Sequence, residues 1–120
     1  MDTGKAKNNY EFFEGYEGET EIVFESDGVK YHFWEGYIDN IVGNPKPSES
    51  GWFGLTRDYN QFEGPFDDSP ESVNTREYLD DLSSYADNEF DKDTKKALKR
   101  LTSIFQNAVT NNHKVTVFAD

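Results

Sequence analysis

Two short runs of alternating apolar and polar residues, Thr20–Glu25 and Val29–Glu35, dominate the first third of the chain. They flank Ser26-Asp27-Gly28, and Asp-Gly between two such runs is among the strongest short-range signals for a β-hairpin. Side chains alternate along a strand, so each run has one apolar face. The apolar set is Ile22, Phe24, Val29, Tyr31 and Phe33, and the opposite face carries Glu21, Glu25, Lys30 and His32.

Turn-forming residues interrupt the middle of the chain. Gly36–Val42 is predicted to form a turn or a short third strand, and residues 43–51 hold two prolines and two glycines that cannot continue a ladder. Trp52–Tyr59 is predicted to return as a strand in which Gly54 marks a bulge. Asn60–Asn74 contains two prolines and a glycine, so we expect an irregular segment, and long loops in compact domains tend to be functional or disordered.

Apolar residues at helical spacing follow from residue 75 onward. We expect a helix over residues 75–86, capped by Thr75. A second helix, Asp93–Val109, has a clearer apolar stripe, and Asn111-Asn112 ends it. Lys114–Phe118 is predicted to be a final strand. The stripe of the second helix consists of Ala97, Leu98, Leu101, Ile104, Phe105, Ala108 and Val109.

The order of these elements indicates an α+β fold, in which a small, mostly antiparallel sheet has two helices packed on one face. The 120 residues are expected to form a single domain that buries about two-thirds of the surface exposed by the unfolded chain. Residues 1–10 are expected to form a flexible N-terminus. They hold two lysines and no apolar stretch, which argues against a secretory signal or a membrane anchor.

The chain contains no cysteine, which excludes disulfides, a thiol nucleophile and cysteine-ligated zinc or iron–sulfur sites. This composition fits a reducing compartment, and together with the N-terminal segment it predicts a cytoplasmic protein. Ten Phe, seven Tyr and two Trp supply apolar area for a folded core, so the high content of charged residues does not indicate a disordered chain.

Charge is divided unevenly along the sequence. The first 91 residues contain 22 Asp and Glu against 6 Lys and Arg, and the last 29 contain 2 against 6, which gives −16 and +4, or −12 in total. Such a field repels nucleic acid and anionic membranes and attracts basic surfaces. A cationic protein is therefore the expected partner, although acidic charge also serves simply to keep proteins in solution.

Two acidic tracts, Glu11–Glu25 and Glu63–Asp91, are interleaved with aromatic residues. Protein interfaces use carboxylates for steering and aromatic residues as buried anchors. The same aromatic residues could instead belong to the core, with the acids merely solvated. We expect the binding surface in the second tract, with Phe66 or Tyr78 as anchor. Its expected members are Glu63, Phe66, Asp67, Asp68, Glu71, Glu77, Tyr78, Asp80 and Asp81.

Alternating acids in the segment 87–93 are similar to the first half of a calcium-binding loop. Lys92 and Leu98, however, occupy the positions where an EF-hand needs glycine and glutamate. Capping of the second helix by Asp91 and Asp93 is the simpler interpretation.

His32 and His113 are the only histidines, and neither has a histidine neighbour at ligand spacing. Each is expected to be hydrogen-bonded or exposed. The sequence has no glycine-rich phosphate loop and no G-x-S-x-G elbow, and among 24 acids some carboxylate pair will always fit a glycosidase by chance. We therefore expect no enzymatic activity, no cofactor and no metal.

Small size, absence of cysteine, strong acidity, the Asp27-Gly28 hairpin and the segment WFGLTRDYNQFEG (52–64) together resemble one class of bacterial protein. These are the immunity proteins encoded beside polymorphic or contact-dependent growth inhibition toxins. The resemblance is one of general type and transfers no site residue. It implies an acidic cytoplasmic inhibitor that binds and neutralises a cognate toxin domain, frequently a basic nuclease.

Two other functions remain open on the sequence. A nucleic-acid mimic acting against a defence enzyme would use the same charge on a different target. A carbohydrate- or ligand-binding module would use Trp34, Trp52 and Tyr59 as a stacking platform on the sheet, although core positions are the alternative for the tryptophans. We expect a monomer, in which the second helix neutralises the acidic first helix through Lys95, Lys96, Lys99 and Arg100.

Overall fold

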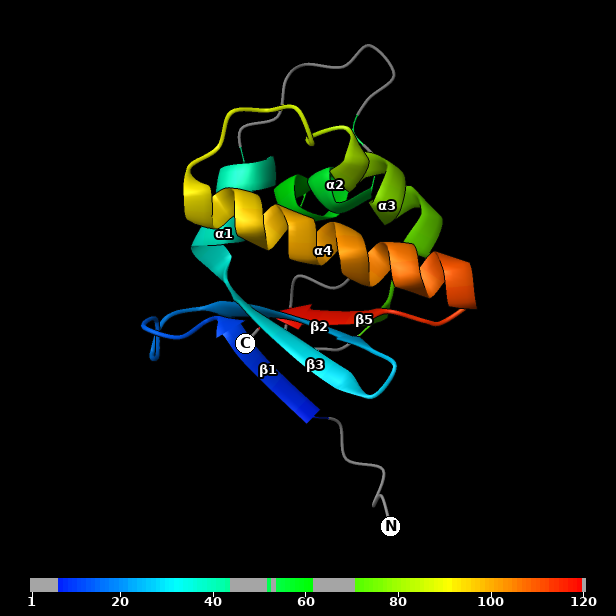
Figure 1. Cartoon of the computed structure of the whole chain (residues 1–120), viewed down its shortest axis with the longest axis horizontal. Helices are drawn as coiled ribbons and strands as arrows, with labels where there is room; N and C mark the ends of the chain where they lie inside the picture. Colours follow the sequence, from blue (N-terminus) through cyan, green and yellow to red (C-terminus); the bar gives the residue numbers. More distant parts are fainter. Residues whose placement is uncertain (1–6, 44–51, 53, 62–70, 120) are drawn as a thin grey trace.

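The computed structural model describes residues 7–43, 52, 54–61 and 71–119. Five strands in these residues form one sheet in the order β1-β3-β2-β5-β4, and four helices lie on one face of it (Figure 1). The strands are β1 (Lys7–Phe12), β2 (Glu21–Ser26), β3 (Val29–Trp34), β4 (Glu71–Ser72) and β5 (Thr116–Ala119). The helices are α1 (Glu35–Val42), α2 (Gly54–Gln61), α3 (Thr75–Ser83) and α4 (Lys92–Asn111). The predicted α+β class is confirmed, with four helices where two were expected.

The predicted hairpin forms β2 and β3, which pair antiparallel from Glu21↔Trp34 to Ser26↔Val29. Asp27 (φ 50°) and Gly28 (φ 78°) make the turn, and two central residues at positive φ are what a type I′ turn requires. Aspartate tolerates this conformation better than most residues, and glycine has no Cβ to clash. The turn therefore fixes the register that directs the apolar face of the hairpin toward the helices.

The sheet is mixed because β1 runs parallel to β3, while β5 pairs antiparallel with β2 and β4 pairs antiparallel with β5. The prediction of a flexible N-terminus is therefore wrong for residues 7–10, which belong to an edge strand. Their polar sequence has low strand propensity. The strand is held by its ladder to β3 and by Phe12, whose ring stacks on Phe33 with centroids 5.1 Å apart.

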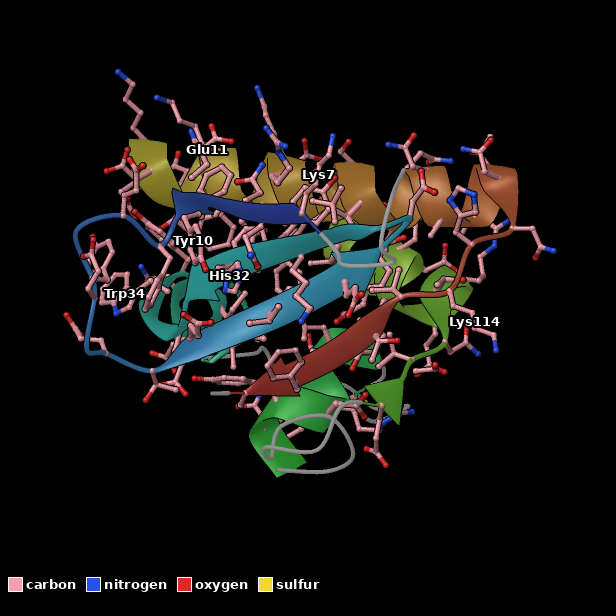
Figure 2. The ribbon with its side chains drawn as sticks, turned by 90° about the horizontal axis from the view of Figure 1, so that it is seen from below. Lys7, Tyr10, Glu11, His32, Trp34 and Lys114 are labelled. Carbon is pink, nitrogen blue, oxygen red and sulfur yellow. The ribbon has the colours of Figure 1, made fainter. Side chains whose placement is uncertain are left out.

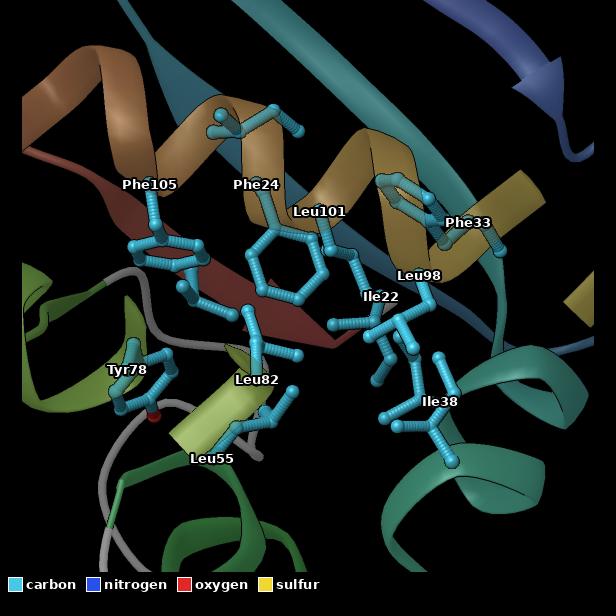
Figure 3. Close-up of a cluster of buried hydrophobic side chains, with 14 of the residues drawn as sticks. Ile22, Phe24, Phe33, Ile38, Leu55, Tyr78, Leu82, Leu98, Leu101 and Phe105 are labelled. Atoms are coloured by element: carbon cyan, nitrogen blue, oxygen red, sulfur yellow. The ribbon is translucent and has the colours of Figure 1, made fainter. Parts of the chain in front are cut away.

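The core lies between the sheet and the helices (Figure 3). Phe24 on β2 meets Phe33 and Phe105 edge-on, with centroids 5.5 and 6.0 Å apart, in the arrangement that aromatic pairs prefer. The predicted stripe of α4 faces this layer. Its buried apolar members are Ala97, Leu98, Leu101, Ile104, Phe105 and Ala108.

Both ends of α4 have clear caps. The Asp91 side chain accepts hydrogen bonds from the backbone N–H and the hydroxyl of Thr94, at 3.1 and 2.6 Å. These bonds hold the pKa of this exposed carboxyl below its usual value. Asn112 ends the helix in the left-handed conformation (φ 56°). The prediction that Asp91 caps the second helix is thus confirmed.

The start of α3 corrects a second detail. Asn74, and not Thr75, is the N-cap, since its side-chain oxygen accepts a hydrogen bond from the Glu77 backbone at 3.0 Å. The helix then ends at Ser83, three residues before the expected end.

Helix α1 replaces the turn or strand predicted for Gly36–Val42. Isoleucine and valine favour strands by propensity, yet the buried residues recur at helical spacing, and α1 packs on β2, β3 and α4. Tertiary packing of this stripe outweighs the local preference. The buried residues are Tyr37, Ile38, Ile41 and Val42.

Helix α2 replaces the strand predicted for Trp52–Tyr59. Gly54 opens it at φ 60°, and a Cβ there would lie 2.8 Å from Asp81 Cβ and 2.9 Å from the Glu77 carbonyl oxygen. The glycine therefore permits a close approach to α3 and does not mark a bulge. Two segments predicted to be irregular lie largely outside the described residues. They are the loop 43–51, of which only Gly43 is described, and the segment 60–74, of which residues 62–70 are not described.

Candidate protein-binding surface

The structure describes five of the nine residues expected to form the binding surface in the second acidic tract. Glu63, Phe66, Asp67 and Asp68 lie outside the described residues. Glu71 on β4 and Asp80 on α3 are exposed, and Glu77 is partly buried.

Tyr78 and Asp81, which were expected on a docking surface, lie in the interior of the structure. Tyr78 is fully buried beside Phe105, and its hydroxyl donates to Asp58 Oδ2. Burial, followed by this hydrogen bond, raises the Tyr78 pKa far above its usual range, so the phenol remains neutral. Asp81 Oδ2 accepts hydrogen bonds from the backbone and hydroxyl of Thr56, both at 2.8 Å. These groups join α2 to α3 and are not available to a partner.

Glu77 serves the same junction. Its Oε1 lies 2.9 Å from an Arg57 guanidinium nitrogen and 2.9 Å from the Gly54 backbone nitrogen. Arg57 also donates through Nε to Asp58 Oδ1 at 2.9 Å. Buried polar groups are costly unless they are hydrogen-bonded, and here acids predicted to face a partner satisfy buried groups of α2.

The first acidic tract forms a surface instead. Tyr10, Phe13, Glu14 and Glu17 line a hollow of about 330 Å³ at the end of β1, here called the acidic–aromatic hollow. The Tyr10 side chain is 47 % exposed, the two glutamates are exposed, and Phe13 forms a nearly buried apolar wall. The hollow thus presents aromatic carbon and carboxylate oxygen side by side.

Local turns create this hollow. The backbone nitrogens of Phe13 and Glu14 both donate to the Tyr10 carbonyl oxygen, at 2.9 and 3.0 Å, which ends the strand and folds the chain back. Gly15 (φ 90°) and Gly18 (φ 92°) then take conformations that other residues rarely adopt, and the segment closes with the Glu19 nitrogen donating to the Tyr16 oxygen at 3.0 Å.

Stacked aromatic side chains support the turns between Phe13 and Glu19. Tyr16 lies flat on Trp34 with centroids 4.1 Å apart, and Tyr37 meets Trp34 edge-on at 5.3 Å. Trp34 Nε1 donates to Glu19 Oε1 at 3.2 Å. Burial, and then the hydrogen bond with Tyr16, raises the pKa of Tyr37 to about 12. Tyr37 therefore stays neutral at physiological pH, and the stack holds the acidic turns in place.

Tyr10 is positioned by His32, which lies on the sheet face away from the helices (Figure 2). The two rings stack with centroids 4.2 Å apart. His32 Nδ1 lies 2.7 Å from Glu21 Oε1 and Nε2 lies 2.9 Å from Asn8 Oδ1. The expectation of a hydrogen-bonded histidine is confirmed for His32, whose nitrogens tie β1 and β2 to β3.

The carboxylates of this surface differ in their pairing. Glu11 forms an ion pair with Arg100 at 2.9 Å, and Glu19 accepts from Trp34. Glu14 and Glu17 form no ion pair within the described residues. The hollow therefore carries two uncompensated negative charges beside an exposed aromatic ring.

The proposed stacking platform for carbohydrate is not formed as predicted. Tyr59 lies on helix α2, where its hydroxyl donates to Asp39 Oδ1 at 3.0 Å, and not on the sheet. Trp34 is stacked against Tyr16, and Trp52 is 39 % exposed, outside the core position considered for it.

No group of three or more metal-binding side chains comes together among the described residues, including Asp87–Asp93. Within the same part of the chain, no helix has the length and apolar character needed to cross a membrane.

The described structure is thus an α+β domain in which an acidic and aromatic hollow lies at the end of β1. Comparison with protein-family models, with curated proteins and with solved structures finds no match to this chain.

Proposed function

We propose that this chain is an acidic cytoplasmic inhibitor that binds and neutralises a cognate basic toxin domain, namely a nuclease. The observation that supports it most is the acidic–aromatic hollow, where exposed Tyr10 lies beside Glu14 and Glu17, two acids with no ion pair in the part of the chain that the structure describes. An interface needs a buried anchor and a charge that selects the partner, and this hollow offers both.

The chemistry of the hollow suits a lysine or arginine side chain. A cation over the face of a tyrosine is attracted by the ring quadrupole, with about 0.5–2 kcal/mol gained as water is excluded. Glu14 and Glu17 would pair with the same cation or with its neighbours. A charge of −12 over the whole chain would steer a basic domain toward it before contact.

The inhibitor would neutralise the nuclease by competing with nucleic acid for the groove that binds the substrate. A nuclease holds the phosphates of its substrate with lysine and arginine side chains. Carboxylates seated on these cations would occupy the substrate path without being cleaved. The proposal does not require any catalytic residue in the inhibitor.

The first experiment captures partners of the tagged chain from the native strain at low salt, and then expresses the product of the adjacent gene alone. A single basic partner, toxic when expressed and harmless with this chain, is the expected result. Capture of several unrelated nucleic-acid-binding proteins would favour the mimic instead, and absence of any partner would remove the proposal.

Matched variants then locate the contact. Glu14→Gln/Glu17→Gln changes the hollow, whereas Glu71→Gln/Asp80→Asn changes two exposed acids of the surface expected from the sequence. Both raise the net charge from −12 to −10, since each removes two carboxylates. We expect the first pair to slow association and to flatten its salt dependence more strongly than the second. Equal effects would show that only total charge matters.

A further inference from the structure

Four exposed lysines lie along one face of helix α4, away from the residues that line the acidic–aromatic hollow. Lys92, Lys95, Lys96 and Lys99, here called the basic stripe, have the spacing i, i+3, i+4 and i+7, which places them on one face of the helix. All four are exposed. Lys95, Lys96 and Lys99 were expected, with Arg100, to neutralise the acidic first helix. Like Lys92, however, they form no ion pair or hydrogen bond within the described residues.

The stripe does not help the chain to fold. Like charges three or four residues apart on a helix repel each other. The helix dipole also disfavours bases in the first turn, where Lys92 and Lys95 lie. Arg100, the next cation, shows the contrast: it pairs with Glu11 and lies 6.0 Å over the rings of Phe12 and Tyr31. Although the chain has 24 acids and 12 bases, none of these four lysines forms an ion pair with a carboxylate of the described residues.

Apolar surface lies next to the stripe. Two hollows of about 390 Å³ each share Phe90, Lys95 and Lys99. One continues along Lys92 and Lys96, and the other passes over Leu98 toward Asp87 and Glu89. The surface thus combines an aromatic and aliphatic floor with a cationic rim on one side and an acidic rim on the other.

We propose that this surface docks an acidic amphipathic segment of a protein partner. Carboxylates of the segment would lie on the basic stripe, and its apolar side chains would pack on Phe90 and Leu98. Asp87 and Glu89 line the far side of the surface and would repel a uniformly charged phosphate backbone. A segment with carboxylates on one side only can place its apolar side next to these two acids and so avoids this repulsion. The surface is separate from the acidic–aromatic hollow, so this proposal does not depend on the proposed function.

The test uses a fluorescein-labelled helical peptide built from glutamate and leucine, titrated with the full chain at low salt and followed by anisotropy. Lys95→Gln/Lys96→Gln/Lys99→Gln is compared with Lys7→Gln/Lys30→Gln/Lys114→Gln. Both variants change the net charge from −12 to −15, since each removes three lysines. We expect the stripe variant to bind about tenfold more weakly and the control to bind within about twofold of wild type.

Two further probes test the chemistry of the occupant. A peptide with serine in place of leucine is expected to lose most of its affinity, because serine makes no apolar contact with Phe90 and Leu98. A single-stranded oligonucleotide of equal charge is expected to bind more weakly than the peptide. Tighter oligonucleotide binding, equal loss in both triple variants, no peptide binding to wild type, or a wild-type dimer that the stripe variant abolishes would each overturn the proposal.

Discussion

The ring of Tyr10 lies 4.2 Å from the imidazole of His32, and the two nitrogens of that imidazole lie within 2.9 Å of oxygens on β1 and β2. The exposed tyrosine of the hollow is therefore supported by a nearly buried histidine that joins three strands. Preorganised anchors bind more tightly because less freedom is lost on association. The hydrogen bonds of His32 should thus matter for stability and for binding.

His32→Ala is expected to lower the free energy of unfolding by about 1–3 kcal/mol, because Glu21 and Asn8 lose their partner. It should also weaken partner binding, since Tyr10 loses the ring on which it stacks. Urea denaturation gives the first quantity. His113→Ala is the control, with an expected change within about 0.5 kcal/mol, because its partly exposed ring makes no hydrogen bond to the residues that the structure describes. Equal stability of the two variants would contradict the role given to His32.

Tyr78→Phe separates folding from binding. Removing the hydroxyl leaves buried Asp58 without one donor, and we expect a loss of about 1–3 kcal/mol in unfolding free energy. Partner affinity should not change, because Tyr78 is fully buried. Weaker binding by this variant, measured under conditions where it is folded, would restore Tyr78 as a contact residue. Tyr10→Phe keeps the exposed ring and should leave stability unchanged.

The close approach at Gly54 makes a further prediction. Gly54→Ala is expected to cost about 1–2 kcal/mol for the left-handed conformation alone. Overlap with Asp81 and Glu77 adds to this cost. Gly28→Ala, at φ 78° with open space around it, pays only the conformational part. The Tm of Gly54→Ala should therefore be lower than that of Gly28→Ala in thermal unfolding. The reverse order would argue against a tight α2–α3 contact.

The buried carboxyl of Asp81 should make the free energy of unfolding depend on pH. Burial raises its pKa above the ordinary value of 3.8, and hydrogen bonds from Thr56 offset part of that effect. The folded state then binds the proton more tightly than the unfolded state, so this group lowers stability as pH rises from 3.8 toward the folded pKa. Asp81→Asn keeps an oxygen for Thr56 and removes this titration.

The stability of Asp81→Asn relative to wild type should accordingly increase with pH across that window and remain level above it. Parallel unfolding curves at a series of pH values provide the measurement. A difference that is constant with pH would mean that the carboxyl is not destabilised by burial.

Turn chemistry and strong periodicity explain what could be predicted. Asp27-Gly28 favours a tight hairpin, and the seven-residue apolar stripe of α4 favours a helix with one buried face. Helix α2 could not be found in this way, because only Leu55 among its buried residues is apolar. Thr56 and Asp58 are buried through hydrogen bonds to α3, and hydrophobic periodicity carries no record of such bonds.

The candidate binding surface was also hard to predict from the pattern of apolar residues. Asp81 and Glu77 have the sequence character of surface acids, and only their contacts with Thr56 and Gly54 reveal their structural role. The hollow was missed because Tyr10 follows polar residues that do not favour a strand. The cluster of aromatic residues at 10–13, interleaved with acids, was the available signal, and its importance depends on a parallel pairing that no local pattern specifies.

The most direct test of the central claim is the footprint of the bound partner on the isotope-labelled chain, measured by amide chemical shifts before and after saturation. The account predicts that the largest changes fall on residues 10–19, with smaller changes at His32 and its neighbours. A footprint centred on Glu71 and α3, with residues 10–19 unaffected, would contradict it.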